Sequence, residues 1–436
     1  MTPREFLKGY SYDRRLVTGA FFSSDPLRVE RGDTVGVVLF NLGGPEKGED
    51  IAPFLYNLFM DPAIIDIPVG GRLRHWLCRL ISKRRSKVVG KDYAAIGGGS
   101  PINRLTREQA HALEERLMRD YGRAEGVVFR TYPAMRYWHP LSEEAASRMQ
   151  RDGVTKAVLL PLYPQYSKTT TGASLVYWHA LREAGEIPDW DTTSVFEYAA
   201  HPRYIQAVSE RIDEALQRFP RPARTGTHLL FSAHGTPLRE MKERRDPYCC
   251  LIHSTVDRVM AHREYDRPYH VSFQSKVGPM EWLTPSTIDK VQELGAEGVA
   301  SLVVVPIAFV TDHIETAFEL DVDLRERAEN AGIHQFEVMS GLNCHPLFVE
   351  ALAEAVVSQI TFPEASKKSS SADAPDLLSG VGDVSRKVHA LCPVQSYSRP
   401  SERRTRCRKC ELIAEARRWV APASASPTSL ITETPT

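Results

Sequence analysis

Residues 300–309 read ASLVVVPIAF, and VTDHIETAFELDVD follows at 310–323. The first stretch is apolar almost throughout rather than alternating, which is typical of a strand covered on both faces. Five further runs share this character: TVGVVLFNL (34–42), GVVFRTY (126–132), KAVLLPLY (156–163), HLLFSAH (228–234) and YHVSFQS (269–275). Between the runs lie segments with helical periodicity, at 106–122, 201–219 and 287–298. This alternation predicts an α/β fold built on parallel, doubly wound sheets.

The chain divides into four expected parts. Similar numbers of predicted strands and helices lie on either side of residue 185, which indicates two Rossmann-like domains. The expected boundaries are an N-terminal arm at 1–33, a first α/β domain at 34–185, a second at 186–362 that ends in a closing helix, and a linker with a basic, Cys-containing tail at 363–436. The Ser-, Ala- and Pro-rich composition after residue 362 is typical of a linker.

Composition excludes several classes of protein. The chain has 436 residues, with 55 Lys and Arg against 55 Asp and Glu. This balanced charge argues against nucleic acid as a partner. No apolar stretch approaches the ~20 residues that a membrane-spanning helix needs, and the first residues lack the apolar core of a secretory signal. Seven Cys in such a long chain are not a disulfide scaffold, so a cytoplasmic location is expected.

His234 is the first candidate site residue. It ends the apolar run at 228–234, and ligands of open parallel sheets bind beyond the carboxyl ends of the strands. A His in that place can act as a general base, bind a metal or hydrogen-bond a neighbouring loop. The pattern alone leaves these roles open.

An acidic row follows the run at 300–309. If this segment is helical, its carboxylates fall along one stripe; they are Asp312, Glu315, Glu319 and Asp323. Like charges at such spacing repel one another, and the repulsion grows beside a buried strand. The row therefore indicates either a path for protons or cations or a solvated acidic face.

Other segments carry candidate ligand contacts. The loop FQSKVGPMEWLTP at 273–285 suits either a flat apolar wall or a loop that packs Trp282 into the core. The run FLYNLFMDPAII at 54–65 is either core or, if exposed, a lip over a ligand or a membrane. The basic segment with Arg84 and Arg85 can hold ligand carboxylates or form a solvated helix face. Neither NLGGP nor GGGSP has the spacing of a P-loop or a dinucleotide fingerprint.

Taken together, these motifs resemble the ferrochelatase family, whose members insert ferrous iron into a porphyrin. The resemblance covers about residues 34–362 and rests on NLGGP, LFMDP, YAAIGGGSPI, MRYWHPL, YPQYSKTTTGAS, FSAHGTP, RRDPY, FQSKVGPMEWL and PIAFVTDHIETAFELD. It implies an enzyme of the last step of haem biosynthesis, which forms protohaem from Fe²⁺ and protoporphyrin IX and releases two protons. Its partners would then be the porphyrin and ferrous iron, with Fe²⁺ as a substrate.

The resemblance also implies roles for particular residues. His234 and Glu315 would face each other at the metal-insertion centre as catalytic and metal-binding groups. A path for protons or metal would run along Asp312, Glu319 and Asp323, on a helix that is locally of the π type. The implied porphyrin contacts are Arg85, Tyr93, Ser100, Arg136, Tyr137, Met280 and Trp282.

A C-terminal group of cysteines departs from the simplest family pattern. Cys392, Cys407 and Cys410 include one C-x₂-C, a spacing typical of zinc or iron–sulfur ligands. Some ferrochelatases hold a [2Fe–2S] cluster with three C-terminal Cys and one Cys in the YPQYS region, where this chain has Lys168. A cluster whose fourth ligand comes from another Cys (Cys344, Cys249 or Cys250) and a tail without metal both stay open.

Alternative functions stay open as well. Within the same class, the substrate could be coproporphyrin III, which differs from protoporphyrin in its number of carboxylates. From another class, the chain could be a non-catalytic haem or metal-binding protein, although a carrier needs no acidic row. A peripheral membrane contact is expected from the lipid-soluble product, and the basic stretch at 386–418 is either a contact with anionic lipid or a solvated tail. The chain is expected to be a monomer or a homodimer.

Overall fold

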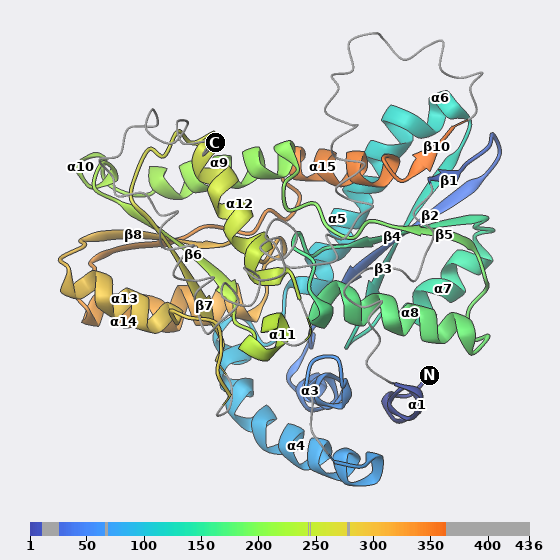
Figure 1. The fold of residues 1–436 in the computed structure, drawn as a ribbon, viewed down its shortest axis with the longest axis horizontal. Coiled ribbons are helices and arrows are strands. Elements are labelled where there is room, and N and C mark those ends of the chain that lie inside the picture. Colours follow the sequence, from blue (N-terminus) through green and yellow to red (C-terminus); the bar gives the residue numbers. More distant parts are fainter. Residues whose placement is uncertain (11–25, 66–68, 243, 245, 277–279, 363–436) are drawn as a thin grey trace, which may run out of the picture.

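Two four-stranded parallel sheets form the centre of the molecule (Figure 1). The computed structural model describes residues 1–10, 26–65, 69–242, 244, 246–276 and 280–362. The strand orders are β3-β2-β4-β5 and β7-β6-β8-β9. In each sheet the chain starts in an inner strand, moves to one edge and then returns to build the other side. The predicted α/β fold with two doubly wound sheets is confirmed.

The strands follow the apolar runs closely. The first sheet consists of β2 (Thr34–Asn41), β3 (Val128–Met135), β4 (Lys156–Pro161) and β5 (Asp191–Ser194). The second consists of β6 (His228–His234), β7 (Tyr269–Gln274), β8 (Ser301–Pro306) and β9 (Gln335–Val338). A separate pair joins β1 (Leu27–Arg28) to β10 (Ile360–Thr361). Because β5 pairs with β4, the first sheet extends beyond residue 185, where the sequence had suggested a domain boundary. The domain boundaries themselves stay a prediction.

Helices connect the strands and cover the sheets. The longer ones are α3 (Ile51–Met60), α4 (Gly71–Ala95), α5 (Ile102–Leu117), α7 (Ser142–Arg151), α8 (Ala173–Glu183), α9 (Pro202–Gln217), α12 (Tyr248–His262), α13 (Thr287–Ala296), α14 (Leu324–Asn330) and α15 (Pro346–Val357). Shorter ones are α1 (Pro3–Gly9), α6 (Arg123–Glu125), α10 (Arg221–Arg224) and α11 (Leu238–Lys242). A 3₁₀ turn spans Gly48–Asp50, and π-helical segments span η2 (Met118–Gly122), η3 (Lys168–Gly172) and η4 (Glu315–Asp323).

Alternate residues of the inner strands enter different cores, as expected for strands that are buried on both faces. In β8, Val303 and Val305 join the largest core cluster, while Leu302 and Val304 pack with residues of α13 and α14. In β2, Val37 joins that same largest cluster. The largest cluster therefore contains one face of each sheet, together with apolar residues of α5, α9 and α15. This shared core joins the two sheets into one body.

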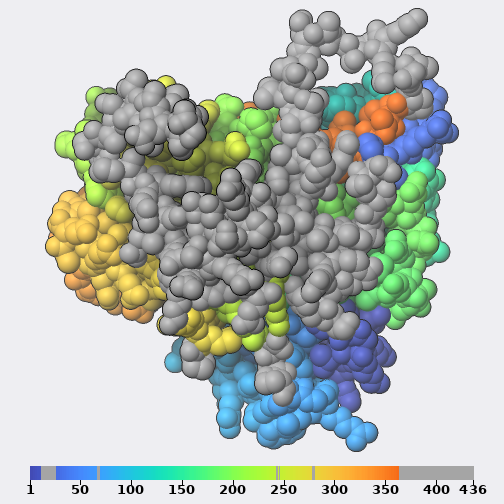
Figure 2. Space-filling view, in the orientation of Figure 1, coloured from blue at the N-terminus to red at the C-terminus, as the bar shows by residue number. Residues whose placement is uncertain are grey.

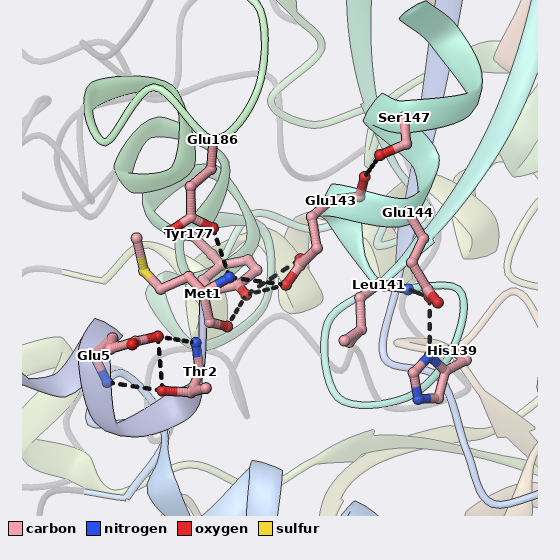
Figure 3. A network of polar contacts seen from close by, with 10 residues as sticks. All are labelled: Met1, Thr2, Glu5, His139, Leu141, Glu143, Glu144, Ser147, Tyr177 and Glu186. Atoms are coloured by element: carbon pink, nitrogen blue, oxygen red, sulfur yellow. Dashed lines mark hydrogen bonds and ion pairs between the residues drawn. The ribbon is translucent and has the colours of Figure 1, made fainter. Parts of the chain in front are cut away.

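The N-terminal helix α1 packs against the first half of the chain rather than standing free. Its N-cap is a capping box, in which Glu5 N donates to Thr2 Oγ1 at 3.3 Å and Thr2 N donates to the Glu5 carboxylate at 2.7 Å (Figure 3). The Met1 amine lies 2.6 Å from Glu186, and the Phe6 ring packs edge-on against Tyr177 at 5.3 Å. Together with α3 and α4, α1 forms the blue projection at the lower edge of Figure 2.

Candidate active site

The site lies at the topological switch point of the second sheet, where the strand order reverses between β6 and β8. His234 is the last residue of β6, and Glu315 begins η4, which follows β8. β6 and β8 are neighbours, but the chain leaves them toward opposite edges of the sheet. At such a switch point the connecting segments diverge and leave a crevice at the carboxyl ends of the strands.

His234 and Glu315 are in direct contact. His234 Nδ1 lies 3.0 Å from Glu315 Oε2, and the side chains are 40% and 16% exposed, respectively. Burial alone would lower the pKa of His234, but the Glu315 carboxylate outweighs it and raises that pKa. Burial likewise opposes ionisation of Glu315, yet the adjacent His234 and His313 hold its pKa well below the usual range. The arrangement is a hydrogen-bonded imidazole–carboxylate pair in which the carboxylate favours protonation of the imidazole.

Three groups that the sequence had not singled out hold Glu315 in place. Gln274 Nε2 donates to Glu315 Oε2 at 2.8 Å, and Ser275 Oγ lies 3.4 Å from the same oxygen. His313 Nε2 lies 3.8 Å from Glu315 Oε1. Gln274 ends β7 and Ser275 directly follows it, so the rule that located His234 could also have found them.

Glu319 extends the acidic site by one more carboxylate. Its Oε2 accepts a hydrogen bond from Ser275 Oγ at 2.9 Å. Burial and the nearby charge of Glu315 raise the pKa of Glu319 to about 7. A low-pKa carboxylate beside one that titrates near neutrality can pass a proton along, because the second group exists in both forms at neutral pH.

The four carboxylates of the acidic row do not all lie on one helix. In the π-helical segment η4, the i→i+5 hydrogen bonds widen the turn, so residues four apart lie nearly in line. Glu315, Glu319 and Asp323 have this spacing. Asp312 precedes the helix, and its carboxylate instead accepts from Thr316 Oγ1, Gly341 N and Asn343 Nδ2 at 3.1, 3.0 and 2.8 Å. The structure thus brings Glu319 to Glu315 and directs the Asp312 carboxylate to the neighbouring loop.

A cavity of about 690 Å³ lies beside the pair. Gly235, Gln274, Ser275, Glu319 and Asp323 are among its lining residues, and the predicted wall residue Trp282 lines it too. Asp323 also pairs with Arg327 at 3.0 Å. Glu319 and Asp323 therefore face one common space next to the His234–Glu315 pair.

The predicted porphyrin contacts differ in exposure, and Trp282 is half-buried. Arg85 on α4 and Met280 are exposed, whereas Tyr93, Ser100, Arg136 and Tyr137 are buried. Tyr93 and Tyr137 share an apolar cluster with Phe54 and Leu55 of α3, and Ile314 packs against that cluster. The cluster therefore lies directly next to Glu315. Burial and the charges of Glu315 and Glu319 raise the pKa of Tyr93.

Arg136 and Tyr137 converge on an aspartate that the sequence had not singled out. Arg136 Nη2 lies 2.7 Å from Asp61 Oδ2, and Tyr137 Oη donates to the same oxygen at 2.8 Å. The Arg136 guanidinium stacks over the Tyr177 ring at 4.0 Å and over the Phe6 ring at 5.0 Å. In this structure Arg136 is paired and covered, and its contact with a porphyrin stays a prediction. Asp61 lies in the LFMDP motif, which was the available signal.

The described residues do not fit a [2Fe–2S] cluster at the YPQYS position. Lys168 is 1% exposed there, and its ammonium lies 2.6 Å from Glu240. An ammonium group has no lone pair with which to bind iron. Cys392, Cys407 and Cys410 lie outside the described residues. Within the described ranges, no group of three or more His, Cys, Asp and Glu side chains is arranged to hold a metal ion.

None of the helices in the described part of the chain combines the length and apolar character that crossing a bilayer requires.

The family profile and the curated relatives reported for this chain carry the description ferrochelatase. The ferrochelatase family profile matches residues 34–360. Ferrochelatase from Synechocystis sp. is 44% identical over 340 residues, covering 76% of this chain and 83% of that protein. Ferrochelatase from Gloeobacter violaceus is 43% identical over 327 residues, covering 75% of this chain and 98% of that protein.

Ferrochelatase from Trichodesmium erythraeum is 43% identical over 330 residues, covering 76% of this chain and 83% of that protein. The solved structure of SirB from Bacillus subtilis with Fe³⁺ covers 76% of this chain and 96% of its own, with a TM-score of 0.41 and 11% identity. That structural likeness is too distant to support an argument. The profile match and the curated relatives confirm the resemblance seen in the motifs: the chain belongs to the ferrochelatase family.

Proposed function

We propose that this chain inserts Fe²⁺ into protoporphyrin IX, forming protohaem and releasing two protons. The observation that carries the proposal is the 3.0 Å contact between His234 Nδ1 and Glu315 Oε2 at the switch point of the second sheet. A free porphyrin carries two pyrrole N–H protons that must leave as the dication enters, so the reaction needs a base beside the ring.

His234 is the proposed base. Its Nδ1 is engaged by Glu315, so Nε2, which has no hydrogen bond to a described residue, is the nitrogen that accepts a pyrrole proton. Glu315 stabilises the imidazolium that forms, and its lowered pKa keeps it ionised for that purpose. Glu315 also supplies the negative charge that attracts the incoming iron.

A proton route away from the pair is proposed along η4. The Ser275 hydroxyl lies between the carboxylates of Glu315 and Glu319. Since the pKa of Glu319 is raised to about 7, this carboxylate can both accept and release a proton at neutral pH. Asp323 lines the same cavity and is the proposed last step before solvent.

Protoporphyrin IX is proposed over coproporphyrin III because the side chains next to the pair are apolar. Partly buried Leu58, Phe59, Val89 and Ile314 pack on the buried cluster that contains Tyr93 and Tyr137, and they suit a macrocycle with few carboxylates. Coproporphyrin III is the second candidate. Anaerobic insertion assays with both porphyrins test the choice: the expected result is a higher kcat/KM for protoporphyrin, and the reverse order would contradict the assignment.

The test of the catalytic base is His234→Ala. This variant should lose iron insertion while it still quenches or shifts porphyrin fluorescence on binding, because the apolar cluster is untouched. The matched control is His262→Ala, which removes an exposed imidazole from the end of α12. Near-normal turnover of His234→Ala would overturn the role given to His234. Haem binding by the wild-type chain without any insertion would favour the carrier function instead.

A peripheral contact with anionic lipid is proposed through α4. Its exposed side chains include Leu73 and Trp76, at 51% and 59% exposure. They also include seven basic residues, whereas the helix has one acid, Asp92; the basic residues are Arg72, Arg79, Lys83, Arg84, Arg85, Lys87 and Lys91. Exposed Trp and Leu among cations suit the interface of an anionic membrane.

Vesicle sedimentation tests this contact. Vesicles that contain phosphatidylserine should bind the chain, phosphatidylcholine vesicles should bind it less, and the double variant Arg84→Glu/Arg85→Glu should release it. Equal binding to both kinds of vesicle would contradict the proposal. The cluster at Cys392, Cys407 and Cys410 stays a prediction, which iron and acid-labile sulfide analysis of the purified chain tests.

A further inference from the structure

A buried polar cluster lies behind His234 and takes no part in the chemistry described above. It joins the segment after β4 in the first sheet to the segment after β6 in the second. Its members are Ser167, Lys168, Glu240, Asp246 and Tyr248, which we call the latch. None of these side chains is more than 6% exposed.

Asp246 is the centre of the latch. Its Oδ2 accepts hydrogen bonds from Ser167 Oγ and from Lys168 N, both at 2.8 Å. Its Oδ1 accepts one from Tyr248 N at 3.0 Å. Burial raises the pKa of Asp246 to about 6, and these three donors oppose the rise. One carboxylate thus ties the first residues of η3 to the first residue of α12.

A buried ion pair also joins the segment after β4 to the segment after β6. Lys168 Nζ lies 2.6 Å from Glu240 Oε2, and both side chains are inaccessible to water. Arg244 lies 3.0 Å from the other oxygen of Glu240. Removing one partner of such a buried pair leaves the other charge uncompensated, so the two ends are held in one geometry.

Tyr248 links the latch to the active site. Its hydroxyl donates to the backbone oxygen of His234 at 3.0 Å. Burial keeps the pKa of Tyr248 well above the usual value, so this hydroxyl stays protonated and remains a donor. His234 is therefore held twice, by Glu315 at its imidazole and by Tyr248 at its backbone.

We infer that Tyr248 is a positioning residue for His234, and that Asp246 sets its place by fixing the start of α12. The inference rests on the proposed function, because it concerns the base of that reaction. The charged groups that face His234 are Glu315 and Glu319, with His313 beyond Glu315. A shift of His234 loosens its contact with Glu315, and the pKa of His234 then falls toward its ordinary value.

Tyr248→Phe removes only the hydroxyl, and it is measured in the full chain. We expect kcat for iron insertion to fall about tenfold, the effect of one lost hydrogen bond on a rate, with KM for porphyrin within about twofold. The acidic limb of the kcat/KM profile, which requires neutral His234, should move to lower pH.

Tyr204→Phe is the matched control. Its hydroxyl is also buried and also donates to a backbone oxygen, that of Ile307 at 3.2 Å, away from His234. It should lower the melting temperature without changing kcat or the pH profile. Identical behaviour of the two variants, or a changed melting temperature alone in Tyr248→Phe, would overturn the inference.

Asp246→Asn keeps the inference testable if Tyr248→Phe does not fold. It leaves the Tyr248 side chain intact and weakens the contacts of residue 246 with Ser167, Lys168 and Tyr248 N, and the same loss of kcat and the same shift of the acidic limb are expected. An unchanged profile in this variant would overturn the inference. A wild-type chain without insertion activity would overturn the proposed function and this inference together, whereas an active wild type with unaffected variants would overturn the inference alone.

Discussion

A buried and a half-buried glutamate follow strands of the two sheets, and their pKa values move in opposite directions. Glu197 follows β5 of the first sheet, is 2% exposed, and has its pKa raised to about 7 by burial. Its carboxylate accepts from the backbone N–H of Ala199 at 3.0 Å. Glu315 follows β8 of the second sheet, and His234 and His313 hold its pKa well below the usual range. Burial favours a neutral acid at both places: at Glu197 the Ala199 N–H and the charge of Arg258 do not outweigh it, whereas at Glu315 the directly adjacent imidazoles do.

The polar residues at the ends of the inner strands also differ between the two sheets. Asn41 ends β2 as His234 ends β6, and its side chain donates to Thr106 Oγ1 at 3.0 Å while its oxygen accepts from Leu42 N at 2.8 Å. Gln165, after β4, donates to Thr255 Oγ1 at 3.2 Å. These neutral groups hold the structure together. Both sheets have the same strand order and therefore a switch point where a site can form, but the residues at that point decide its chemistry.

The largest effect is expected for Glu315→Gln, which replaces the charged group after β8 with a neutral amide like those that follow the inner strands of the first sheet. Without the carboxylate, His234 loses the group that stabilises its protonated form, so kcat should fall by roughly 10²–10⁴-fold. Iron insertion and the thermal melting curve are measured together. Glu197→Gln is the matched control, with kcat unchanged, and a small effect of Glu315→Gln would show that the pair is not the reacting centre.

Glu197→Gln should instead change stability, in a pH-dependent way. A folded-state pKa of about 7 means that this carboxyl favours the folded state below its unfolded pKa and loses that contribution as the pH rises through 7. At pH 8 the variant should be more stable than the wild type by about 3 kcal/mol, and at pH 4 the two should be equal. Urea unfolding at both pH values checks this, and an equal gain at pH 4 would contradict it.

Glu319→Gln should have a smaller effect on the rate. It removes the group that titrates near neutrality but leaves His234 and Glu315 in contact. We expect kcat to fall roughly tenfold, since one proton-transfer step loses its acid–base partner, and the dependence of kcat on pH around 7 to flatten. Pre-steady-state insertion measured across that pH range tests this. A profile identical to that of the wild type would remove Glu319 from the proton route.

The smallest effect is expected for Asp323→Asn. Asp323 and its partner Arg327 are 43% and 44% exposed, so water can replace the carboxylate as the last proton acceptor. We expect kcat within about twofold of the wild type and a loss of stability below about 0.5 kcal/mol. The same insertion assay and urea unfolding measure both quantities. A loss as large as that of Glu319→Gln would extend the essential part of the route to the surface.

The sequence could predict the sheets from local pattern, whereas the His234–Glu315 pair was implied by the resemblance to the ferrochelatase family. Continuous apolar runs marked six strands, and His234 stood at the end of one. The short strands β5 and β9 were not predicted, because four residues, two of them Thr in β5, give too weak a signal. The stripe of carboxylates was counted at α-helical spacing, whereas the resemblance implied a locally π-type helix, and η4 has that form and carries Glu315, Glu319 and Asp323.

Apart from the His234–Glu315 pair, which the resemblance implied, long-range partners could not be predicted from the sequence. Arg136 was singled out as a porphyrin contact, but nothing in the sequence pattern pairs it with Asp61, 75 residues earlier in the chain. The same holds for Tyr248, whose hydroxyl donates to the backbone oxygen of His234, 14 residues earlier in the chain. Such contacts follow from the tertiary fold of each half of the chain, which sequence spacing does not encode.

The most direct test of the account is an NMR titration of the His234 imidazole in the wild-type chain and in Glu315→Gln. The account predicts a pKa above the ordinary value of about 6.5 in the wild type. In Glu315→Gln the pKa should fall below that value, because burial then acts without the opposing charge. The same titration curve in both proteins would contradict the claim that His234 and Glu315 act as one acid–base pair.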